Sequence, residues 1–189
     1  TALGVKPIFL ALQNREGNTR MHDVMTSSVH LGDNSSAQQE MQRIADGLTS
    51  EGFMVVRKKI ETVPWHPAAP SEETGVKTIP AGCYFESHLN ILVTSKMSSA
   101  GNEREALSVL ATHHNAHLSK NVFKQHTETE YTIMMTLRSY IVQRETFERM
   151  RDNLVEDIKH FGFEIEKVIT EFAVYDSKND HDSAWLSVK

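Results

Sequence analysis

The chain has 189 residues, of which 39% are hydrophobic and 24% are charged, and its formal net charge is -5. This length suits one ordinary domain or two small lobes that share a core. No run approaches the ~18 apolar residues of a membrane span, and the first residues lack the layout of a signal peptide, so we expect a cytoplasmic protein. The acidic balance argues against a general nucleic-acid binder, and the single cysteine, Cys83, excludes an internal disulfide bond.

The first part of the sequence changes between strand-like and helical periodicity. The predicted elements are strands over 6–13, 25–29 and 53–63 and a helix over 35–51. Asn34 or Ser35 is expected to cap this helix, and Gly52 is expected to end it. Four of the five prolines fall within 64–80, which indicates that the first lobe, 1–66, is followed by a connector over 67–82.

The second part repeats this change of periodicity over a longer stretch. The predicted elements are strands over 83–94, 116–123, 131–142 and 163–175 and helices over 102–114 and 145–161. In the last helix Phe147, Leu154 and Ile158 form one apolar stripe. The order βαββαβ is that of a ferredoxin-like unit, a four-stranded antiparallel sheet with both helices on one face. This second lobe spans 83–176 and is followed by a tail over 177–189.

The two parts also resemble each other at a constant offset of 110 residues. Residues 25–66 lie over 135–176 without a gap, with five identities that include Gly52 on Gly162 and Glu61 on Glu171. The predicted fold is therefore α+β, with duplicated ferredoxin-like units of which the first lacks its opening strand and helix. Because that strand lies inside the sheet, we expect a processed fragment whose first lobe is completed by a second chain, in a homo-oligomer or by another polypeptide. The alternative is that the first lobe folds differently.

Polar side chains recur on the strand faces that point away from the predicted helices. On the strand 83–94 the alternate residues Glu86, His88 and Asn90 share that face. The same alternation predicts that a polar cleft lies between the two sheets, lined also by Thr26, Arg57, Lys59, Thr136 and Arg138.

These residue types suit the binding or turnover of an anionic small molecule, best a phosphate-containing one. His88 is the candidate general acid or base and Glu86 its partner, while Arg57, Lys59 and Arg138 are candidates to bind the anion. Asn90, Thr26 and Thr136 are further candidate ligand-binding residues. We expect no metal and no cofactor.

Two other interpretations remain open at this point. The polar residues can instead fill an interface between the sheets as Glu–Arg and Glu–Lys pairs. The open sheet face can also bind a partner chain, which defines a structural or interaction protein without catalysis.

The histidine on a central strand of a two-lobed fold resembles the arrangement in 2H phosphoesterases, which have one His-x-Thr/Ser motif in each lobe. Here His88-Leu89-Asn90 gives one such motif, with Asn90 in the place of Thr or Ser. The resemblance implies phosphoester or nucleotide chemistry at His88.

Overall fold

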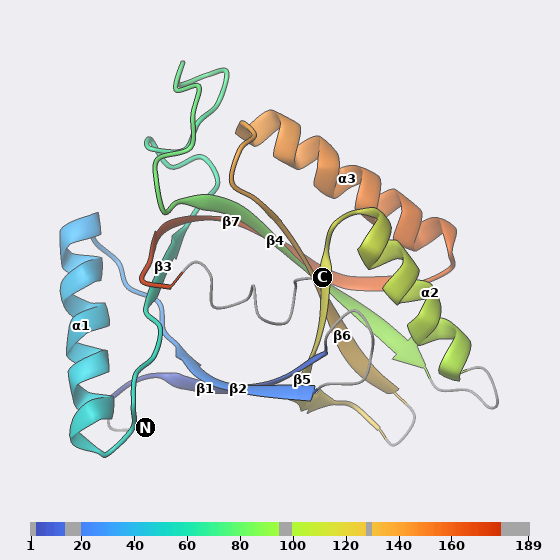
Figure 1. The fold of residues 1–189 in the computed structure, drawn as a ribbon, viewed down its shortest axis with the longest axis horizontal. Coiled ribbons are helices and arrows are strands. Elements are labelled where there is room, and N and C mark those ends of the chain that lie inside the picture. The colour runs from blue at the N-terminus through green and yellow to red at the C-terminus, as the bar shows by residue number, and fades with distance from the viewer. Residues whose placement is uncertain (1–2, 14–19, 95–99, 128–129, 179–189) are drawn as a thin grey trace.

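The computed structural model describes residues 3–13, 20–94, 100–127 and 130–178 (Figure 1). The strands are β1 (Lys6–Gln13), β2 (Arg20–Ser27), β3 (Lys59–Thr62), β4 (Tyr84–Thr94), β5 (His117–Gln125), β6 (Glu130–Ser139) and β7 (Glu164–Asp176). The helices are α1 (Asn34–Ser50), α2 (Ala100–His113) and α3 (Arg144–His160). No helix in the described part of the chain is long and apolar enough to cross a membrane.

The described strands form one seven-stranded sheet in the order β2-β1-β5-β6-β4-β7-β3, with every neighbouring pair antiparallel. The sheet curls strongly, with α2 and α3 on its convex side and α1 beside β3 (Figure 1). The α+β class is confirmed. The first-lobe strands do not form a sheet of their own, because β1 and β2 extend one edge of the common sheet and β3 extends the other.

The core lies between the central strands and the helices α2 and α3. On β4 the residues Phe85, Leu89 and Ile91 are completely buried, and they belong to the same hydrophobic cluster as Phe147 and Leu154 of α3. Because successive side chains of a strand point to opposite faces, this packing directs Tyr84, Glu86, His88 and Asn90 to the concave face.

Three predicted details of the first lobe differ from the structure. The second strand begins at Arg20, earlier than the predicted residue 25, because it pairs with β1 along its whole length. The predicted strand 53–63 is reduced to β3, an edge strand that has only β7 as a neighbour in the described chain. The cap of α1 is Asp33, whose side chain accepts a hydrogen bond from the backbone N–H of Ser36 at 2.8 Å.

Candidate functional site

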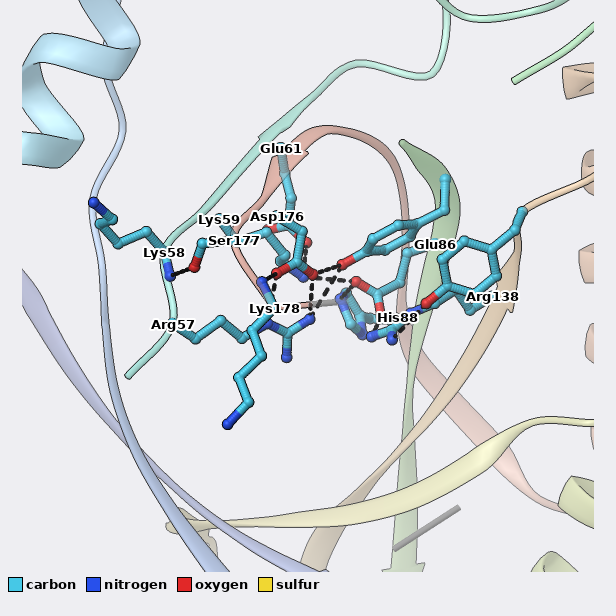
Figure 2. A network of polar contacts seen from close by, with 12 residues as sticks. Arg57, Lys58, Lys59, Glu61, Glu86, His88, Arg138, Asp176, Ser177 and Lys178 are labelled. Carbon is cyan, nitrogen blue, oxygen red and sulfur yellow. Dashed lines mark hydrogen bonds and ion pairs between the residues drawn. The ribbon is translucent and has the colours of Figure 1, made fainter. Parts of the chain in front are cut away.

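A network of charged and tyrosine side chains lies on the concave face, where β3, β4, β6 and β7 run side by side (Figure 2). Hydrogen bonds and ion pairs connect its members. We call this group the Glu86 network, and it comprises Arg57, Lys59, Glu61, Tyr84, Glu86, His88, Arg138 and Asp176.

Glu86 is the centre of this network. Its side chain is only 1% exposed, and its two carboxylate oxygens accept hydrogen bonds from different cations. The Nζ of Lys59 donates to Oε2 at 2.7 Å, while Nε and Nη2 of Arg138 both donate to Oε1, at 3.0 and 2.5 Å. Glu86 and Arg138 are direct cross-strand partners in the β4–β6 ladder, which holds this contact in register.

The charges of this cluster determine its protonation. Burial alone raises the pKa of Glu86, but the positive charges of Lys59 and Arg138 outweigh this effect and hold the pKa well below its usual range. Burial likewise opposes the charge on Lys59, whereas the carboxylates of Glu86 and Glu61 raise its pKa. Lys59 also forms an ion pair with Glu61. The ionised forms therefore stabilise one another.

A second set of contacts joins the residues just before β3 to the end of β7. Arg57 donates from Nε to Oδ1 of Asp176 at 2.9 Å and from Nη2 to Oδ2 at 2.5 Å, a bidentate pair. The hydroxyl of Tyr84 donates to the same Oδ2 at 2.7 Å. The ring of Tyr84 also lies 4.6 Å from the Arg138 guanidinium carbon, so this tyrosine connects both halves of the network.

His88 lies between a hydroxyl and two carboxylates. Its Nδ1 is 2.9 Å from Oγ1 of Thr136, and its Nε2 is 3.6 Å from Oε2 of Glu86 and 4.0 Å from Oε2 of Glu171. Burial raises the pKa of Glu171 to about 7, and the nearby charge of Glu61 adds to this effect. The site thus contains a carboxyl group that exchanges a proton near neutral pH beside an imidazole ring.

Most of the predicted site residues converge at this place. Lys59, Arg138 and His88 each contact Glu86, and Thr136 contacts His88. Arg57 joins this group through Tyr84. Two further predicted residues lie outside these contacts.

Asn90 shares the concave face with His88 but is two residues further along β4 and almost buried. Thr26 does not reach the site: it is exposed and pairs with Pro7 at the far edge of the sheet. The register across β1 and β5 directs Thr26 to the face opposite that of Thr136, because Leu12 opposes Ser119 there.

Four residues of the site were not assigned a functional role from the sequence: Glu61, Tyr84, Glu171 and Asp176. Tyr84 shares the alternation of Glu86 and His88, so its place on the concave face was visible in the sequence. Asp176 ends the last strand, and its partner Arg57 is 119 residues away in the chain. Only the β3–β7 pairing brings these two together, and no local pattern reports that pairing.

The fold and site define an α+β protein with a buried ion-pair network on the concave face of a curled antiparallel sheet. This network includes His88, and the Glu171 carboxyl group, whose pKa is raised, lies beside it. No family model matches this sequence, and no curated protein is significantly similar to it.

Proposed function

We propose that the concave face around Glu86 binds a small anionic molecule, best one that contains a phosphate group. The observation that supports this is the convergence of Lys59, Arg138 and His88 on one buried carboxylate. Both cations are of the kinds that bind oxyanion oxygens, Arg138 as a planar fork and Lys59 as a point charge. An incoming anion takes the place of Glu61 as a partner of Lys59, because the Glu61 carboxylate is partly exposed.

The proposed chemistry is general acid–base catalysis at a phosphoester, as the resemblance to 2H phosphoesterases implies. His88 supplies an imidazole whose Nδ1 contacts Thr136, so its Nε2 is the atom left to exchange a proton with a ligand. Glu171 adds a carboxyl group with a pKa of about 7, a value suited to either direction of proton transfer near neutral pH.

Phosphate titration and hydrolysis of bis(4-nitrophenyl) phosphate test this function. We expect saturable binding of inorganic phosphate by the wild-type chain, weakened about tenfold or more in Arg138→Met, because a hydrogen bond to a charged group contributes about 1.5–3 kcal/mol. His88→Gln is expected to abolish hydrolysis, while the control His114→Gln, at the end of α2 outside the network, leaves binding and hydrolysis unchanged. Absence of phosphate binding to the folded wild type contradicts the anion site, and binding without turnover restricts the function to binding.

We further propose that the fold arose by duplication of a ferredoxin-like unit. Pro7 pairs with Thr26 as His117 pairs with Thr136, which is the same hairpin register at the offset of 110 residues. Gly52 and Gly162 both end their helices at positive φ, 87° and 84°. The order β7-β4-β6-β5 agrees with one complete unit, and β1, β2, α1 and β3 correspond to the second half of another.

A second candidate function, binding of a partner chain at the incomplete lobe, is favoured by exposed apolar side chains before β3. Phe53, Met54 and Val56 are 62%, 86% and 50% exposed. In the repeat they correspond to the start of β7, which pairs with β4. An added strand beside β3 pairs its backbone and covers these side chains.

Sedimentation of the wild type and Val56→Glu tests this alternative. We expect a homo-oligomer that the charge at residue 56 dissociates, whereas Ile141→Glu, also at an exposed apolar residue but beyond β6, leaves the mass unchanged. A wild-type monomer at all concentrations argues against self-association at this edge.

A further inference from the structure

Glu61, His88 and Glu171 come from three strands that are adjacent in the sheet, β3, β4 and β7. Each offers one ligand atom, and these three atoms lie within 4.8 Å of one another. Figure 2 shows Glu61 and His88 directed toward the centre of the Glu86 network. The group combines an imidazole nitrogen with two carboxylate oxygens, a mixed donor set of the kind that transition metals bind in proteins.

The orientation of His88 suits a metal ligand. Its Nδ1 is 2.9 Å from Oγ1 of Thr136, which can accept the Nδ1 proton, and this leaves the lone pair of Nε2 directed at the carboxylates. Nε2 is 3.6 Å from Glu86 and 4.0 Å from Glu171, longer than a good hydrogen bond to either. A histidine that binds a metal usually donates its other ring N–H to a neighbouring group, and the hydroxyl of Thr136 is placed to accept that hydrogen bond.

The carboxylates near His88 differ in their partners. Lys59 and Arg138 both pair with Glu86, and Lys59 also pairs with Glu61. Glu171 is partly buried, and its one ion pair within the contacts described above is the long one to His88. A bound metal ion supplies the close cation that Glu171 lacks among these contacts.

We propose that Glu61, His88 and Glu171 form a binding site for one divalent transition-metal ion, zinc or manganese by their nitrogen and oxygen donors. Three protein ligands leave a coordination position open for water or an anion, as in catalytic metal sites. The proposal does not rest on the anion site, and a metal ion on Nε2 of His88 takes the place of proton transfer at that atom. Glu61 contributes one oxygen to the metal while the other retains its pair with Lys59.

A second group, His113, His114 and Asp157, has a similar donor set but a different local chemistry. Nε2 of His114 already contacts Oδ2 of Asp157 at 2.7 Å, so this histidine and this carboxylate satisfy each other. His113 is exposed, and the two histidines are neighbours in the chain. This group provides the matched control.

The test is calorimetric titration of the EDTA-treated full chain with Zn²⁺ and with Mn²⁺ in a phosphate-free buffer. We expect one saturable site per chain, with affinity lowered about 10–100-fold or more in Glu171→Gln, since the loss of outer partners alone has that effect. The controls are Glu166→Gln, which changes a glutamate of the same strand that accepts a hydrogen bond from Thr132, and His114→Gln. Both are expected to retain wild-type affinity.

Folding is checked by circular dichroism. If Glu171→Gln does not fold, Glu61→Gln takes its place, because Glu61 is in a four-residue edge strand. The proposal is overturned if neither metal binds, if both glutamine variants bind as the wild type does, or if His114→Gln abolishes binding. Metal binding without phosphate binding supports this site and contradicts the proposed anion site, so the two failures are distinguishable.

Discussion

Replacing Glu86 with glutamine tests whether the network is held together by its central carboxylate. The substitution keeps the volume of the side chain, so it creates no cavity, but it removes the charge that Lys59 and Arg138 share. Because Glu86 is 1% exposed, water cannot replace the lost charge. Removing one partner of a buried ion pair costs about 3–5 kcal/mol, a large fraction of the ~5–15 kcal/mol that stabilises a typical domain.

The measurement is urea unfolding at pH 7, followed by circular dichroism, in wild type, Glu86→Gln and the double variant Glu86→Gln/Arg138→Met. We expect the single variant to lose about 3–5 kcal/mol in the free energy of unfolding. The double variant should recover part of this loss, because methionine leaves one unpaired cation fewer at the buried site.

The matched control is Glu40→Gln on α1. Glu40 pairs with Arg43 one turn later at 2.7 Å, but these side chains are 30% and 53% exposed, so water reaches the pair. An exposed pair of this kind contributes about 0.2–1 kcal/mol, so the control should barely change the unfolding curve. If Glu86→Gln costs no more than this control, the network does not stabilise the fold and the argument from its burial is refuted.

Three further predictions concern the surroundings of the site. Asp176→Asn removes the bidentate ion pair with Arg57. Hydrogen bonds from Arg57 and Tyr84 hold the pKa of Asp176 below its usual value. The ionised Asp176 therefore stabilises the fold at neutral pH, and this stabilisation fades as the pH falls below ~4. The difference in Tm between this variant and wild type should therefore shrink between pH 7 and pH 3, and a difference that grows with acid contradicts the assignment. Phe147→Ala, in the core of α3, should cost about 3–5 kcal/mol in urea unfolding, and a cost below ~1 kcal/mol would mean that the helix is not packed on β4 as described. Gly162→Ala should lower stability by about 1 kcal/mol in the same assay because its φ is 84°, and an unchanged curve would argue against that helix end.

The sequence predicted the parts of the fold that depend on local periodicity. Alternation along 83–94 placed Glu86 and His88 on the face opposite Phe85 and Leu89, and the structure has them there. The helices α1 and α3 were predicted to within one residue at each end, since an apolar stripe and a following glycine define each of them.

What the sequence could not predict depends on contacts between distant segments. Strand alternation does not reveal which strands become neighbours, so the assignment of β1 and β3 to opposite edges of one sheet was missed. The same limit explains why Thr26 was wrongly predicted to line the site, because a one-residue difference in strand register turns every side chain to the other face. It also explains Asp176, whose partner depends on the β3–β7 ladder.

The short length of β3 affects how often this strand opens locally beside the site. A four-residue edge strand separates from its neighbour at a low free-energy cost, whereas β4 is paired on both sides and opens only with the whole domain. We therefore expect amide hydrogen exchange at Ile60 to be far faster than at Leu89, and each opening of β3 to separate Lys59 from Glu86.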